Sequence, residues 1–496
     1  MRTGLNQAIR AEARGVAPFR HQQLTFDTAD GMCVERGLFL LADANAIAES
    51  ERVHRVVQLV TASAAREVAW PEGRRQFDLE RLQLLLQSTA TDFGPPLESA
   101  PVLLPRARIV LRGRRGLLRA QGADSTVIEA VSQRCEIRTA MNNLVLYRFG
   151  LTLVSGTLDG LFEVARDWQQ RFDLTVDPHP HYVQAARLAA GKRRRPRKFG
   201  APVWQEGRQL ADTATYPVVG EAGVLAAVIA DVLINACAIS EGDADEHRLQ
   251  AFEDAVHSIG CLLEQRRAGT VPASLMAYLQ VLLNRRSEAS AIKWLERALR
   301  DDSSAQAPAI KSLLSAARSS SPASLRSLAV DPKTRAWLLE LLGWAGCEDG
   351  ISGPGHEAPG LAEQSACRQR LETRLSKAQA DAELALTEDV SRRARLWHDL
   401  SQLDEALTLF GPILPRRLML RYRMVARAAL GPLTDWLTIT RAIERAPNHL
   451  TDPAASEALL SQWRSEQQAA NERVLTQLSR LSQSSNLGSR PGLPAL

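Results

Sequence analysis

Arginine is the residue type in this sequence whose clustering most clearly points to chemistry. Four arginines, Arg108, Arg112, Arg114 and Arg115, lie close together in or between two successive β-like runs, "PVLLPRARIVLRG" and "RGLLRAQG". Six more basic residues follow in "GKRRRPRK": Lys192, Arg193, Arg194, Arg195, Arg197 and Lys198. A guanidinium can donate two parallel hydrogen bonds to one phosphate. Both clusters therefore predict contact with a phosphate-rich polyanion, and a solvated interdomain linker is the alternative for the second.

Other candidate chemical groups are sparse. The loop "DPHPHY" holds His179 and His181, but no third ligand stands near them in the sequence, so the pattern favours a plain loop over a zinc site. The six cysteines show no C-x-x-C spacing, which indicates neither a zinc site nor a disulfide framework and favours a reduced, cytoplasmic setting. No G-x-S-x-G elbow is present to suggest a serine nucleophile.

Short β-rich runs occupy the first third of the chain and would carry the arginines of residues 108–115. They include "VHRVVQLV", "REVAW", "STVIEAV" and "NNLVLYRFGLTLVSG", separated by turn residues, and predict an antiparallel sheet or barrel. One helix, "DLERLQLLLQS", interrupts them. A second helix should begin after Thr157, whose hydroxyl is a suitable N-cap.

The remainder of the 496 residues is rich in helical patterns, and a chain of this length predicts more than one domain. We expect a β domain over 1–190, a basic linker over 191–217 and helices over 218–484, with two helical groups split near 346–360 and a disordered tail over 485–496. The net charge of +5 permits an anionic partner. The most apolar run, 224–239, is broken by Asp231 and Asn235, so no membrane segment is predicted.

Three stretches resemble known families. "TFDTADGMCVERGLFL" is similar to the strand, turn and strand of CYTH domains, which belong to the triphosphate tunnel metalloenzymes. "EDAVHSIGCLLEQRRAG", with His257 and Arg267, and "WHDLSQLDEALTLFGPILPRR" resemble the two helical motifs of CHAD domains. The resemblance implies an α+β protein of two domains: an N-terminal antiparallel β barrel or tunnel-like sheet without its first strand, and C-terminal all-α bundles.

The CYTH resemblance also implies a set of inward-facing acids and bases that bind metal and triphosphate, and most of that set is missing. Leu41 and Asp43 stand where two arginines are expected. The alternating acids of the last strand are replaced by Arg148, Gly150 and Thr152. Glu129 is the one clear surviving candidate metal ligand, and one carboxylate does not make a phosphoryl-transfer site. Asp27, Thr28 and Asp30 are expected only to hold the turn.

These features favour a non-catalytic protein that binds polyphosphate or another polyanion and has no cofactor. Its contacts would be the two basic clusters together with His257 and Arg267, which match phosphate-binding positions of the CHAD motif. One alternative is an inorganic triphosphatase using Mg²⁺, a hydrolase for which Glu129 would be the remaining acid. Another is a helical scaffold that binds a protein partner.

Overall fold

The computed structural model describes most of the chain, and the structural statements below concern these residues alone. They are 2–35, 38–44, 53–59, 65–71, 102–120, 126–191, 220–242, 244–264, 271–283, 310–311, 314–315, 325–347, 361–387, 389–410, 416–445 and 453–483. Two compact units form. Unit 1 comprises Met1–Val218, Leu225–Ala255 and Ala329–Pro354, and unit 2 comprises Val219–Val224, Val256–Leu328 and Gly355–Leu496. The expected helix at 78–88 and the basic segment 192–198 lie outside the described residues.

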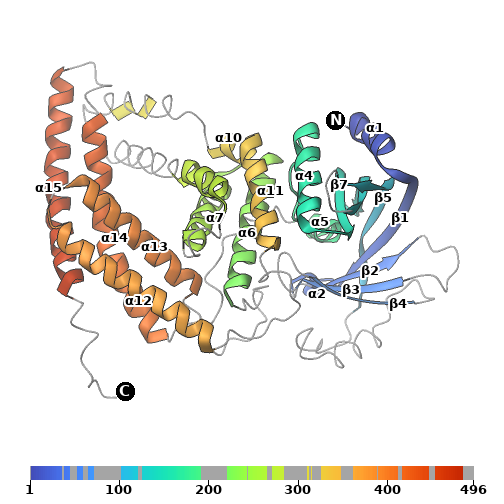
Figure 1. Ribbon diagram of the computed structural model, residues 1–496, viewed down its shortest axis with the longest axis horizontal. Coiled ribbons are helices and arrows are strands. Elements are labelled where there is room, and N and C mark those ends of the chain that lie inside the picture. Colours follow the sequence, from blue (N-terminus) through green and yellow to red (C-terminus); the bar gives the residue numbers. More distant parts are fainter. Residues whose placement is uncertain are drawn as a thin grey trace. The chain divides into compact units, whose positions relative to one another are not determined.

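Unit 1 is built on a seven-stranded antiparallel sheet (Figure 1). Its strands are β1 (Arg14–Asp27), β2 (Leu38–Asp43), β3 (Val53–Leu59), β4 (Ala65–Pro71), β5 (Leu104–Arg119), β6 (Val127–Thr139) and β7 (Asn143–Ser155). The order is β4-β3-β2-β1-β5-β6-β7, so the predicted antiparallel sheet is confirmed. The order has β4 and β7 at its ends, and no pairing between these two closes a barrel in the described part of the chain.

The strand and turn around residue 27 have the predicted form. β1 pairs with β2, and Asp27 closes the connection by accepting backbone hydrogen bonds at Oδ1 from Thr28 (2.8 Å) and Cys33 (2.9 Å). Thr28 donates its hydroxyl to Asp30 Oδ1 at 2.5 Å. A short helix, α2 (Met32–Glu35), follows the turn. These side chains therefore stabilise the turn, as the sequence predicted.

The two faces of the sheet are covered by different helices. Side chains alternate between faces along a strand, and directly opposed residues share a face. Ile109, Leu111 and Cys135 form a core with Ala185 of α5 (His181–Ala189), so this side is called the α5 face. On the other side, Leu118 and Ile128 form a core under α1 (Arg2–Glu12) and α4 (Leu158–Phe172). The helices contribute Leu5 and Ile9 from α1 and Trp168 from α4.

Helix α4 begins where the sequence predicted. Thr157 is the N-cap, and its hydroxyl accepts a hydrogen bond from the Gly160 backbone nitrogen at 3.2 Å. Gly156, just before it, has φ +101°, and a Cβ there would lie 2.4 Å from the Thr126 hydroxyl. Glycine is therefore required at this position both by conformation and by space. In the next turns of α4, Trp168 stacks on Phe149 with ring centroids 4.6 Å apart.

Helices complete unit 1. α11 (Pro332–Cys347) packs against α4: Gln169 donates to the Arg335 carbonyl at 3.0 Å, and Phe162 contacts Gly343. The described part of 220–330 also contains α6 (Gly220–Ser240), α7 (Glu246–Glu264), a helical stretch over 273–283 and α10 (Leu325–Val330). Of this region, unit 1 includes only Leu225–Ala255 and the residues from Ala329 onward. In the described residues, no helix combines the length and the hydropathy needed to cross a bilayer.

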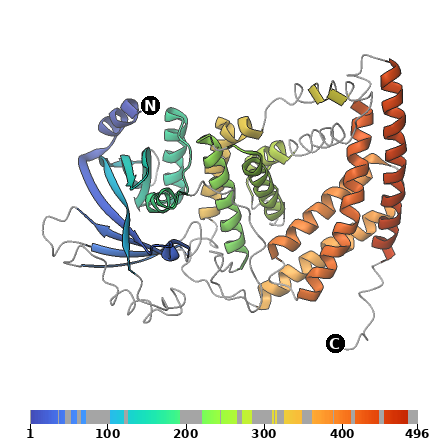
Figure 2. The same cartoon turned by 180° about the vertical axis from the view of Figure 1, so that it is seen from behind.

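The C-terminal region is helical, as predicted. Unit 2 contains α12 (Leu361–Leu384), α13 (Val390–Phe410), α14 (Arg416–Arg445) and α15 (Pro453–Gln483) (Figure 2). A buried arginine, Arg393, fixes their packing by donating to Asn471 Oδ1 at 2.6 Å and lying 4.2 Å from the Trp436 ring centroid. The predicted loop over 346–360 lies outside the described residues from 348 onward.

Candidate polyanion-binding surface

Three arginines meet in one row across the sheet of unit 1. Arg20 on β1 is paired with Arg112 on β5, and Arg112 is paired with Arg134 on β6. Neighbouring strands are about 4.8 Å apart, so the three side chains leave one face within about 10 Å of each other. Arg20 and Arg112 are exposed, and Arg134 is partly exposed. We call this side of β1, β5 and β6 the arginine face.

Further arginines extend the arginine face along the strands. Arg108 is paired with Arg138, four residues from the first row on each strand, and both are exposed. Arg114 lies two residues from Arg112 and therefore shares its face. Arg115 does not: the register puts it on the α5 face, opposite Val131. Of the four arginines predicted on this strand, three thus lie together and one points the other way.

One acid moderates the charge of this surface. Glu136 lies between the two arginine pairs on β6, and Arg138 donates to it from Nε at 2.7 Å. The hydrogen bond from Arg138 lowers the pKa of Glu136; burial opposes this, and the charges of Arg138, Arg134 and Arg112 add to the lowering. Among the described residues of the arginine face on β1, β5 and β6, Glu136 is the only acid against six arginines. The surface keeps a strong positive charge.

The paired arginines do not stabilise the fold. Like charges directly opposed on neighbouring strands destabilise a sheet. The apolar end of the same side, where Asn6 of α1 lies 3.1 Å from the Ser132 hydroxyl, is covered by α1 and α4, yet these helices do not extend over the arginine rows. Exposed guanidinium groups held at this spacing suit a ligand that carries successive negative charges.

The α5 face carries the positions at which the CYTH resemblance implies metal and phosphate ligands. On β6 and β7, Glu129 is paired with Thr152, and Gln133 is paired with Arg148. Between them, Val131 of β6 is paired with Arg115 on one side and with Gly150 on the other. All of these side chains lie on the α5 face. Helix α5 covers only part of this face, because Arg115, Gly150 and Thr152 are exposed. Helix α5 packs Val183 and Ala186 against Leu41 and Phe39, and Ala185 against Ile109.

A small polar network remains beneath α5. Asp43 Oδ1 lies 3.1 Å from His21 Nε2, and Arg55 lies 3.5 Å from its second oxygen. Burial raises the pKa of Asp43, but the hydrogen bond from His21 and the charges of His21 and Arg55 lower it below its usual value. His181 Nε2 lies 3.0 Å from Gln23 Oε1. Burial lowers the pKa of His181 to about 4, and the nearby positive charges of Arg148, His21 and Arg55 add to this.

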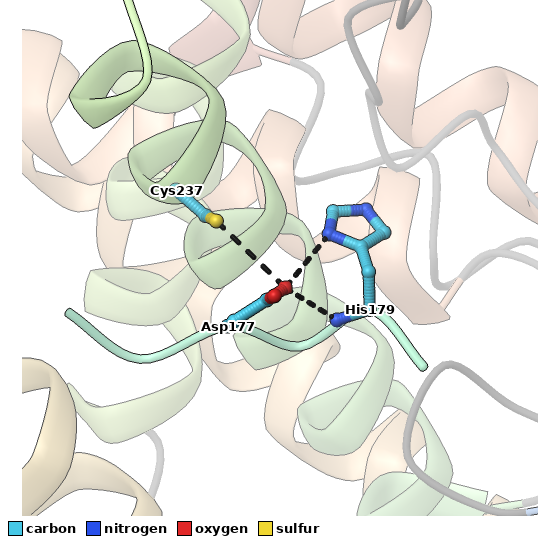
Figure 3. Close-up of side chains that lie close together, drawn as sticks. All are labelled: Asp177, His179 and Cys237. Atoms are coloured by element: carbon cyan, nitrogen blue, oxygen red, sulfur yellow. Dashed lines mark hydrogen bonds and ion pairs between the residues drawn. The ribbon is translucent and has the colours of Figure 1, made fainter. Parts of the chain in front are cut away.

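The loop before α5 holds a cluster that the sequence did not reveal. His179 lies beside Asp177, and Cys237 of α6 reaches the same carboxylate (Figure 3). The expectation that His179 has no third potential ligand nearby is therefore wrong. Asp177 is two residues from His179 in the sequence. Cys237 lies 60 residues after Asp177, and no local sequence pattern connects the two segments.

The other predicted contacts lie away from the arginine face or outside the described residues. His257, on α7 in unit 2, is 7% exposed, and its Nε2 lies 3.3 Å from the Ser401 hydroxyl. A buried ring in this position does not present itself to a long polyanion. Arg267 and the cluster Lys192, Arg193, Arg194, Arg195, Arg197 and Lys198 lie outside the described residues. Arg20, Arg134 and Arg138 were not predicted, because only the strand register brings them beside Arg108 and Arg112.

Comparison with models of protein families and with the sequences of curated proteins finds no match for this chain.

Proposed function

We propose that this protein binds a phosphate-rich polyanion, with inorganic polyphosphate as the representative ligand, through the arginine face of its sheet. The observation that carries the proposal is the row formed by Arg20, Arg112 and Arg134, with Arg108 and Arg138 in the next exposed row. A flexible phosphate chain crossing the strands would meet a guanidinium at each strand, about 4.8 Å apart.

The proposal assigns the protein a binding role rather than catalysis. On the α5 face, Arg148, Gly150 and Thr152 replace the acids that the CYTH resemblance implies, and Glu129 is left without an acidic neighbour on the paired residues Leu117 and Thr152. The likeness of the helical region to CHAD domains, which the resemblance associates with polyphosphate, supports the ligand class, while the proposal places the contacts on the arginine face of unit 1 alone.

A salt titration tests this function. Wild-type protein is titrated with long-chain polyphosphate at several salt concentrations, and log K is plotted against log salt. For binding by charge neutralisation the plot is linear, with a slope of about −0.7 per arginine–phosphate contact, by analogy with single-stranded nucleic acids. Five exposed or partly exposed arginines in two rows therefore predict a slope of about −3 to −4. Absence of binding at low salt, or binding that does not change with salt, would reject the proposed function.

A further inference from the structure

We propose that Asp177, His179 and Cys237 form a binding site for a transition-metal ion, for which zinc is the best match. Asp177 Oδ1 lies 3.4 Å from His179 Nδ1 and 3.9 Å from Cys237 Sγ (Figure 3). All three ligand atoms lie within 4.8 Å of one another. All three residues belong to unit 1.

The spacing suits a tetrahedral ion. Zinc bonds of about 2.0 Å to oxygen, 2.1 Å to nitrogen and 2.3 Å to sulfur separate neighbouring ligand atoms by about 3.3 to 3.6 Å in a tetrahedron. The two distances from Asp177 Oδ1 differ from this range by a few tenths of an ångström at most. The third separation, between the ligand atoms of His179 and Cys237, is at most 4.8 Å, so these two side chains would have to approach each other by up to about 1.2 Å to bind one ion.

The ligand types select the metal. Mg²⁺ and Ca²⁺ prefer oxygen ligands, whereas one thiolate, one imidazole and one carboxylate suit Zn²⁺. Three protein ligands leave a fourth position for water or another side chain. Glu241 is a candidate for it, since its Oε1 lies 3.7 Å from Cys237 Sγ.

The surroundings orient the ligands. Arg148 donates to Asp177 Oδ2 at 2.5 Å and to the His179 carbonyl at 2.5 Å, and Gln184 donates to the same carboxylate oxygen at 3.3 Å. Asp177 Oδ1 is thereby directed toward His179 and Cys237, and such outer contacts are a regular part of metal sites. The His179 side chain and Cys237 are each 3% exposed, whereas the Asp177 side chain is 26% exposed, so an ion here would be shielded on the side of His179 and Cys237 and reachable by water on the side of Asp177.

A bound ion would join two distant parts of unit 1. Asp177 and His179 lie in the segment between α4 and α5, while Cys237 lies near the end of α6. The metal would therefore hold α6 against the sheet-bearing part of the chain and stabilise unit 1. This inference does not depend on polyanion binding, so either proposal can fail without the other.

Cobalt spectroscopy on the full-length chain tests the site. The protein is treated with chelator and titrated with Co²⁺, which reports a tetrahedral sulfur-containing site by intense visible bands and a thiolate-to-cobalt charge-transfer band. We expect saturation at one equivalent and displacement by Zn²⁺. Cys237→Ser should abolish the charge-transfer band and weaken Zn²⁺ binding by more than the 10- to 100-fold typical of outer-shell changes. Cys367→Ser, at a buried cysteine of unit 2, is the matched control and should bind as wild type.

X-ray absorption of the zinc-loaded wild type provides a readout that needs no variant. We expect one sulfur ligand with nitrogen and oxygen neighbours. Substoichiometric cobalt, a charge-transfer band that survives in Cys237→Ser, or a zinc spectrum without sulfur would overturn the proposal.

Discussion

Replacing Arg20, Arg112 and Arg134 together by glutamine should weaken polyphosphate binding by on the order of 10²-fold at low salt. Each substitution removes one charged hydrogen-bond donor from the central row, and a contribution of about 1 kcal/mol from each would give this factor. The salt plot should also become flatter, by about 2 in slope, because three phosphate contacts are lost. Fluorescence titration of the variant and the wild type over the same salt series measures both effects.

A matched variant shows whether binding depends on the position of these arginines or only on the net charge of the protein. Arg368, Arg392 and Arg395 are exposed residues of α12 and α13 in unit 2. Their replacement by glutamine lowers the net charge by the same three units and leaves the arginine face intact. We expect nearly wild-type affinity and slope from it. Equal losses in the two triple variants would mean that binding follows net charge and not the arginine face.

Acidification should loosen the sheet beneath α5, and His181 should be the main cause. Its pKa is about 4 in the folded protein and about 6.5 in the unfolded chain. The unfolded chain therefore takes up a proton first, and the stability contributed by neutral His181 is present above pH 6.5 and lost as the pH falls toward 4. The difference of 2.5 pKa units corresponds to about 3 kcal/mol at most.

Hydrogen exchange of peptides from α5 and β1 measures this loss locally. Wild-type protection should fall between pH 6.5 and 4 relative to His181→Gln, compared at the same pH so that intrinsic exchange rates cancel. His247→Gln, at an exposed histidine of α7, is the control and should follow wild type. The Asp177 carboxyl acts at lower pH: burial raises its pKa, but His179 and Arg148 lower it to about 2. An unchanged pH profile in His181→Gln would contradict this assignment.

Much of the strand pattern could be predicted because it depends on local properties. β-Branched runs bounded by turn residues gave the segments β3, β4, β6 and β7, and the Thr157 cap marked the start of α4. One strand differed: the runs before and after residue 114 were predicted separately, but both lie in β5, Leu104–Arg119. Its Gly113 fits tightly against β6, since a Cβ there would lie 2.0 Å from the Ser132 carbonyl oxygen.

The candidate surface could be predicted only in part. Successive side chains of a strand point to opposite faces of the sheet, and this local rule places Arg112 and Arg114 on one face and Arg115 on the other. The position of Arg20 and Arg134 beside Arg112 depends on register between distant segments, which hydrophobic patterning of a single strand does not fix. The same reason explains why Cys237 was not connected with His179: tertiary packing brings α6 to that loop.

Arginine footprinting of the wild-type protein shows directly which arginines contact polyphosphate. The protein is modified with an arginine-specific dicarbonyl reagent, with and without polyphosphate, and the modified positions are quantified by mass spectrometry. We expect polyphosphate to protect the exposed residues of the arginine face, Arg20, Arg108, Arg112 and Arg138. Arg368 and Arg392 of unit 2 should remain reactive. Protection of the unit 2 arginines with no change on the arginine face would contradict it.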